Sequence, residues 1–109
     1  MLSAVGATTP VRIIGEYDNG YPRAPRILQP GIIAIASTGA TLTYNIEVTG
    51  DDLDAAGYSA ATGNWAPLNG MSGLTATAVN TLGAAVTAIR ARVTAYTSGT
   101  LTFQFIQLV

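Results

Sequence analysis

The alternation of apolar and polar residues is clearest near the end of the chain. One set of alternate positions holds Ile89, Ala91, Val93 and Ala95, and the other holds Arg90, Arg92, Thr94 and Tyr96. After Thr97-Ser98-Gly99 a second alternating run begins. Two period-two runs around a short glycine-containing break are typical of a β-hairpin with one buried face. We therefore predict a hairpin within residues 81–109, with the following core residues: Ile89, Val93, Leu101, Phe103 and Phe105.

Two further strands are predicted in the middle of the chain. Residues 31–37 form a continuous apolar run rich in β-branched residues, which favours a buried strand. Residues 41–49 alternate, with Leu42, Tyr44, Ile46 and Val48 on one side. Because only Thr38-Gly39-Ala40 separates the two runs, we expect them to pair as an antiparallel hairpin.

The remaining segments predict shorter elements. Strands are expected within residues 11–17, 64–68 and 74–79, and a loop over residues 18–26, where Asn-Gly and two prolines interrupt regular structure. Residues 51–58 could alternatively form one helical turn, and residues 81–94 a helix, although β-branched residues favour a strand there. Residues 1–9 are small and uncharged, and we expect them to form an N-terminal arm ahead of a domain at residues 10–109.

These elements predict an all-β fold. With 109 residues the chain is long enough for one domain and one core. About six to eight short strands separated by turns, without a long amphipathic helix, are typical of an antiparallel β-sandwich or jelly roll.

The low content of charged residues indicates a protein whose surface is partly covered by partners. Charged residues make up only 10% of the chain, against roughly 25% in ordinary globular proteins. A surface rich in Thr, Ser, Ala and Gly is more typical of a protein that is buried against partners than of a soluble monomer. All five cations are arginine, the cation favoured at interfaces, although a GC-rich coding bias would explain this equally well.

Missing residue types exclude several functions. The chain has no cysteine and no histidine, so Ser-His-Asp and Cys-His catalysis and thiolate metal sites are excluded. A net charge of −1 provides no long-range electrostatic attraction for nucleic acid or for an anionic membrane. No apolar run reaches the roughly 18–20 residues of a membrane span, and the N-terminus lacks a signal-peptide pattern. We predict no catalytic residue, no cofactor, no metal, no nucleic-acid partner and no membrane partner.

Two weaker candidates for chemistry remain. Asp51, Asp52 and Asp54 could hold calcium, but they do not match the EF-hand spacing, and a solvated acidic loop is the favoured interpretation. Trp65 with Tyr58, Tyr44 and Tyr96 could form a platform that stacks on sugars. The favoured alternative is that Trp65 fills the core between two sheets.

The arginines of the last strands are the best candidates for a contact surface. Arg90 and Arg92 project from one face of a strand, about 6–7 Å apart. We expect them to pair with acidic groups, either Glu47 within the domain or residues across a subunit interface. Tyr96 lies on the same side of the strand. The strand that ends at Leu108 and Val109 has no charged residue that would prevent its edge from pairing with another strand. The predicted contact surface comprises Arg90, Arg92, Tyr96, Leu108 and Val109.

The segment Ala88-Ile89-Arg90-Ala91-Arg92-Val93-Thr94-Ala95-Tyr96-Thr97-Ser98-Gly99-Thr100-Leu101-Thr102-Phe103 resembles small virion proteins of tailed bacteriophages. Trp65-Ala66-Pro67-Leu68-Asn69-Gly70 is a further similarity, so the resemblance covers roughly the last half of the chain. It implies a β-sandwich subunit of a virus particle. The expected function is a non-enzymatic capsid decoration (cement) protein, acting as a homotrimer on a major capsid protein. A tail or fibre component and a carbohydrate-binding module are the alternatives.

Overall fold

The computed structural model describes residues 1–13, 17–18, 21–22, 30–83 and 86–107. These residues form strands and connecting segments, and none of them is helical. The strands are β1 (Gly6–Ala7), β2 (Val11–Arg12), β3 (Tyr17–Asp18), β4 (Tyr21–Pro22), β5 (Gly31–Ala36), β6 (Thr41–Thr49), β7 (Ala66–Pro67), β8 (Ala78–Thr81), β9 (Ala88–Ser98) and β10 (Leu101–Ile106).

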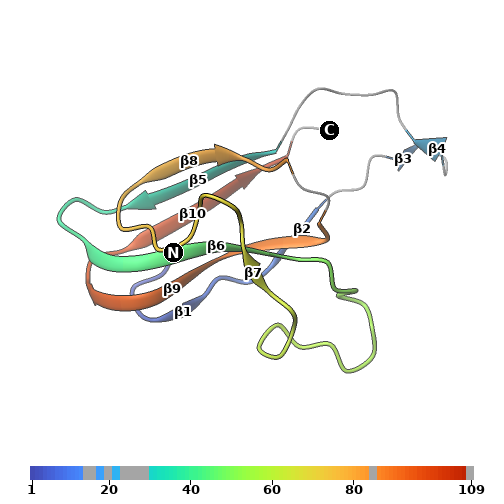
Figure 1. The fold of residues 1–109 in the computed structure, drawn as a ribbon, viewed down its shortest axis with the longest axis horizontal. Helices are drawn as coiled ribbons and strands as arrows, with labels where there is room; N and C mark the ends of the chain where they lie inside the picture. The colour runs from blue at the N-terminus through green and yellow to red at the C-terminus, as the bar shows by residue number, and fades with distance from the viewer. Residues whose placement is uncertain (14–16, 19–20, 23–29, 84–85, 108–109) are drawn as a thin grey trace.

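Two antiparallel sheets pack as a sandwich (Figure 1). The larger sheet has the order β1-β9-β6-β7, with β2 also paired to β9, and the smaller has the order β10-β5-β8. The strands β3 and β4 form a separate antiparallel pair, which begins at the last residue of the strand expected at 11–17 and otherwise lies in the segment expected to be a loop. The predicted all-β sandwich is confirmed.

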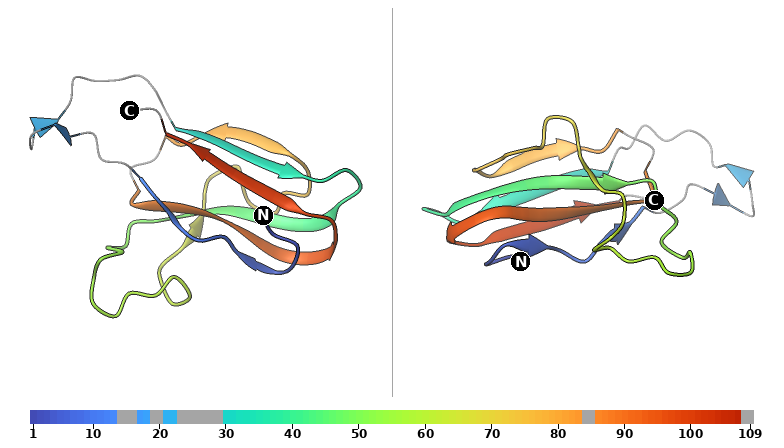
Figure 2. Two further views of the ribbon diagram at one scale, coloured as in Figure 1. Left: turned by 180° about the vertical axis from the view of Figure 1, so that it is seen from behind. Right: turned by 60° about the horizontal axis from the view of Figure 1, so that its bottom comes forward.

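Both predicted hairpins are wrong, because the strands that follow one another along the chain lie in different sheets. The strand β9 pairs with β6, and β10 pairs with β5. The chain therefore crosses from one sheet to the other after β5 and again after β9, as Figure 2 shows. Alternation determines which side of a strand is buried, and both pairings satisfy it equally.

The two crossings lie against each other. The N–H of Ser37 donates to the carbonyl of Thr100 at 2.9 Å, and the N–H of Thr100 donates to the Ser37 hydroxyl at 3.0 Å. Gly99 has φ +94° at this point, and a Cβ there would lie 2.7 Å from the Cα of Ala40. Glycine is therefore required both by its dihedral angle and by the close approach of the two crossings.

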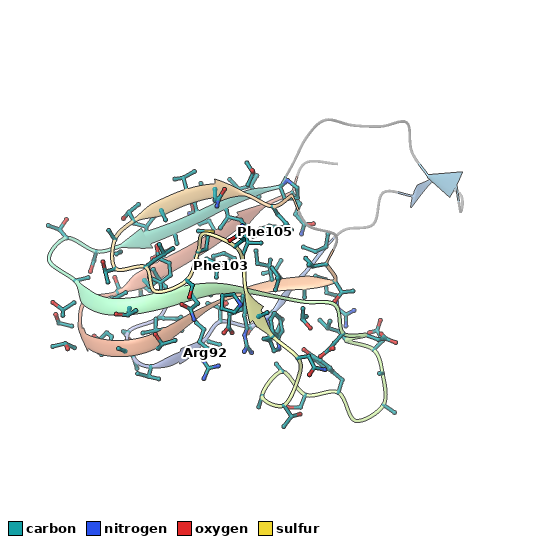
Figure 3. The ribbon with its side chains drawn as sticks, in the orientation of Figure 1. Arg92, Phe103 and Phe105 are labelled. Atoms are coloured by element: carbon teal, nitrogen blue, oxygen red, sulfur yellow. The ribbon has the colours of Figure 1, made fainter. Side chains whose placement is uncertain are left out.

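The predicted core is largely confirmed. Ile89, Val93 and Leu101 are fully buried, while Phe103 and Phe105 are partly buried and pack against the same cluster. Figure 3 labels both phenylalanines on the smaller sheet. The inner side of β6 supplies the following buried residues: Leu42, Tyr44 and Ile46.

The N-terminal segment belongs to the sandwich and is not a free arm. Gly6 and Ala7 pair with Val93 and Arg92 of β9. Leu2 exchanges two backbone hydrogen bonds with Leu101, with lengths of 2.7 and 2.8 Å. Residues 2–7 therefore follow the side of the sandwich where β9 and β10 lie.

Candidate contact surfaces

A buried ion pair lies on the outer side of the larger sheet. Glu47 of β6 is directly opposite Arg90 of β9. The Arg90 Nε–H donates to Glu47 Oε1 at 2.9 Å, and the guanidinium NH2 lies 2.8 Å from the same oxygen. Only 8% of the arginine side chain and 7% of the glutamate side chain are exposed. Of the two partners expected for Arg90, an acidic group across a subunit interface or Glu47 within the domain, the structure shows Glu47.

The segment after β6 covers this ion pair. The Trp65 ring centroid lies 4.2 Å from the Arg90 guanidinium carbon, and the Ala60 carbonyl accepts a 3.1 Å hydrogen bond from Arg90. Burying a charged pair is tolerated when its remaining hydrogen-bonding capacity is satisfied, and Ala60 supplies that acceptor. Arg90 therefore lies beneath this segment and not on the exposed surface that we expected it to share with Arg92 and Tyr96.

The prediction that Trp65 fills the core between the sheets is wrong. Trp65 is partly buried on the outer side of the larger sheet, over a cation, and the core cluster does not include it. The four aromatic residues of the proposed sugar platform do not share one surface either, since Tyr44 is fully buried in the core. The stacking of an aromatic ring on a guanidinium stabilises the covered ion pair instead.

Asp51 anchors the covering segment. One of its carboxylate oxygens accepts the backbone N–H of Asn64 at 2.7 Å, and the other accepts the Asn64 amide at 3.2 Å. The Asn64 carbonyl in turn accepts the Thr49 hydroxyl at 2.7 Å. The hydrogen bonds from the Asn64 backbone and then from its side chain hold the pKa of Asp51 below its usual value. Asp51 therefore links the start of the segment to the residue before Trp65.

The three aspartates have separate hydrogen-bond partners, although all three line one pocket of about 340 Å³ together with Arg12. Asp54 forms an exposed bidentate pair with Arg12, with contacts of 2.8 and 3.2 Å. Asp52 accepts the backbone N–H of Asp54 at 2.9 Å. Within the part of the chain that the structure describes, no three acidic side chains are grouped to hold a metal ion.

Of the two arginines of β9, Arg92 is the one that reaches the surface. Half of its side chain is exposed, and its NH1 lies 3.9 Å from Glu47 Oε2, at the limit of an ion pair. Figure 3 shows it on the outer side of β9. Of the predicted contact residues it is the one whose charge is available to a partner, while Leu108 and Val109 lie outside the described residues.

Tyr96 lies on the opposite side of β9 from the one we expected. The pairing of β9 with β6 shifts between Val93 and Ala95 and again after Tyr96, so one extra β9 residue is accommodated at each shift. A β-bulge of this kind reverses which side the following residues face. Tyr96 therefore pairs with the buried Leu42 and packs on the core, and its hydroxyl donates to the Gly99 carbonyl at 2.9 Å.

A shallow pocket of about 330 Å³ lies beside Tyr96. Its lining residues are Ala40, Thr41, Leu42, Thr43, Thr75, Ala95, Tyr96 and Thr97. None of these side chains is an acid, a base with a pKa near neutrality, or a metal ligand of the usual types. The pocket therefore offers no group for proton transfer near pH 7.

The outer side of the smaller sheet is uncharged and carries a group of exposed aliphatic residues, with Thr81, Thr102 and Gln104 on the same side. Its exposed aliphatic residues come from all three strands, and we call them the apolar face: Ile35, with Ile33 beside it, on β5, Val79 on β8 and Ile106 on β10. Val79 is 73% exposed, Ile106 44% and Ile35 41%. The strands β5, β8 and β10 contain no charged residue. The sequence analysis missed this surface, although its signal was present: a strand that is apolar at every position is typical of burial on both sides.

No protein-family model, no curated protein and no solved structure matches this chain. Among the described residues, no helix has the length and apolar character needed to span a membrane. The functional proposal below therefore depends on the surfaces of the protein and on the resemblance of residues 88–103.

Proposed function

We propose that the protein is a non-enzymatic structural subunit that works within a larger assembly, and specifically a decoration protein of a bacteriophage capsid. The apolar face is the single observation that carries this proposal. Three of its side chains are each more than two-fifths exposed in the isolated chain. Covering such residues stabilises a contact by about 25 cal/mol for each Å² of apolar surface removed from water.

The size of the apolar face supports a docking role. Two six-residue strands and the four-residue β8 give the whole outer side of the smaller sheet, its polar positions included, a footprint of at most about 20 Å by 14 Å, or roughly 300 Å². Contiguous apolar patches of roughly 300–600 Å² on a monomer are often functional. An area of this size alone is smaller than the roughly 800 Å² that each partner contributes to a stable interface, so the contact needs either many copies or adjoining surface.

The chemistry of the sheet supports a structural partner over a small ligand. The apolar face is the outer side of a sheet, and its strands offer no charged group to orient a substrate. Capsids present the same site many times, so subunits that are linked to one another can bind there through several modest contacts at once. The phage-like segment of β9 and β10 is the reason for choosing a virion over another assembly.

Binding to capsids tests this proposal. Purified protein is mixed with undecorated heads built from the major capsid protein of the same genome, and the heads are then sedimented. The proposal predicts that the protein sediments with the heads until a fixed number of sites is filled. No binding to heads would overturn it, and binding to isolated tails in the same assay would favour the tail or fibre alternative.

A further inference from the structure

The outer edge of β10 carries unpaired backbone groups. Leu101 exchanges its N–H and C=O with Leu2, so at this residue both groups point away from β5. Thr100, one position earlier, bonds toward Ser37 on the β5 side. Because this direction alternates along a strand, the N–H and C=O of Phe103 and Phe105 also point outward. No backbone hydrogen bond joins these four groups to another described residue.

The open part of this edge is short and has defined ends. At one end Leu2 occupies the position beside Leu101. At the other end β10 stops at Ile106, and the next side chain, Gln107, donates to the Arg12 carbonyl at 2.9 Å. The edge open to another strand is therefore residues 102–106, with Gln104 at its centre.

The sequence of this edge is nearly symmetric about Gln104. It reads Thr-Phe-Gln-Phe-Ile and contains no charged residue and no proline. Charged residues and prolines are the residues that usually prevent an edge strand from pairing with another chain. Two antiparallel copies centred on Gln104 would place each Phe103 opposite Phe105 of the other copy. All four outward backbone groups of each strand would then be satisfied by their equivalents. Self-complementarity of this kind is what a two-fold interface requires.

We propose that two copies of this chain pair through β10, antiparallel and centred on Gln104, to form one six-stranded sheet with the order β8-β5-β10-β10-β5-β8. The two central glutamines face each other on the outer side, where their amides can exchange hydrogen bonds. The phenylalanines of the two strands pair on the inner side and extend the core across the contact. The two apolar faces then lie on the same side of the joint sheet, one on either side of the central glutamines, within a joint footprint of roughly 600 Å².

This pairing goes beyond the proposed function and stands without it. It is a two-fold contact, so it differs from the homotrimer expected from the resemblance. Five paired residues on each strand bury less area than a permanent interface, so the contact is weak in solution and is best captured by cross-linking.

Single-cysteine variants test the register, because the natural chain has no cysteine. In Gln104→Cys the two sulfurs face each other across a non-hydrogen-bonded pair, where Cα atoms are about 4.5 Å apart, within reach of a disulfide. In the matched control Thr102→Cys, residue 102 lies opposite residue 106. Its own equivalent is then about 13 Å farther along the strand, beyond the roughly 7 Å limit for a disulfide. We expect mild oxidation to link Gln104→Cys at least about tenfold faster than Thr102→Cys.

A mixture of Thr102→Cys and Ile106→Cys completes the test, since these two positions are opposite each other in the proposed register. We expect linked heterodimers in the mixture and almost none in either variant alone, on non-reducing gels and by intact mass. Far-UV circular dichroism checks that each variant is folded. The proposal is overturned if folded Gln104→Cys stays monomeric while its thiol reacts with a maleimide, or if Thr102→Cys links as fast. Head binding by an unlinked variant would leave the capsid role intact while removing the dimer.

Discussion

Replacing Arg90 with methionine removes the cation from the covered ion pair and keeps most of the side-chain volume. Glu47 is then left 7% exposed, and the cation that remains beside it among the described residues is Arg92 at 3.9 Å. The Ala60 carbonyl loses its charged donor, and Trp65 loses the guanidinium beneath its ring. All of these losses fall on one small region of the larger sheet.

The expected loss of stability follows from the burial of both partners. Breaking a buried ion pair costs about 3–5 kcal/mol, because the surviving charge is left without compensation. The half-exposed Arg92 offsets part of this, so we expect about 3 kcal/mol for Arg90→Met. A domain of this size has a total unfolding free energy of about 5–15 kcal/mol, so the variant loses a large share of its stability.

Urea unfolding followed by far-UV circular dichroism measures this loss. Fluorescence of Trp65, the one tryptophan in the chain, provides an independent probe and should itself change when the guanidinium is removed. Arg92→Met is the matched control, because a half-exposed pair at 3.9 Å contributes at most about 1 kcal/mol. The double variant Glu47→Met/Arg90→Met leaves no unpaired charge and should recover most of the loss.

Two results would refute this reasoning. Equal losses in Arg90→Met and Arg92→Met would mean that burial does not strengthen the Glu47 contact. A double variant as unstable as Arg90→Met would mean that the loss comes from packing on Trp65 and not from the uncompensated carboxylate.

Three further predictions concern the crossings and the titrating groups. Gly99→Ala should lower the free energy of unfolding by about 2–4 kcal/mol, because the new Cβ meets Ala40. Gly39→Ala, at a residue with φ +75° and open space around it, should lower it by only about 1 kcal/mol in the same urea titration. Burial raises the pKa of Tyr44, so the contribution of this group to the free energy of unfolding is complete below pH 10.0 and is lost as the pH rises further. Tyr44→Phe should therefore reduce the loss of thermal stability at alkaline pH. The lowered pKa of Asp51 stabilises the fold above pH 3.8, and this stabilisation is lost as the pH falls further. Asp51→Asn should therefore weaken the decrease of the melting temperature at acid pH. An unchanged dependence of the melting temperature on pH would contradict the role given to Asp51.

Periodicity predicted the strands and the buried sides better than it predicted their partners. The alternation around Ile89, Val93 and Leu101 identified core residues correctly. The hairpins were wrong because a short glycine-containing break serves equally well for a turn within a sheet and for a crossing between sheets. The distinguishing information is three-dimensional, namely the contact of Gly99 with Ala40.

The candidate contact residues show the same limit. Glu47 could be named as a candidate partner of Arg90 from its opposite charge and its place on the polar side of a strand, but the pairing of β6 with β9 that brings them together was not predicted. The cover over that pair could not, since Trp65 reaches it through an irregular segment without a periodic pattern. The reversal at Tyr96 depends on β-bulges, which leave no strong signal in a single sequence.

The central claim is that the apolar face is the surface through which this protein joins its assembly. Ile35, near the end of the central strand of the smaller sheet and 41% exposed, is the position to test, and Ala95, exposed on the larger sheet, is its control. The decisive measurement is the affinity of folded Ile35→Lys and Ala95→Lys for undecorated heads, compared with the natural protein. We predict a loss of at least about 100-fold for Ile35→Lys, since an unpaired charge would be buried, and less than about threefold for Ala95→Lys. Equal affinities for both variants would contradict the account.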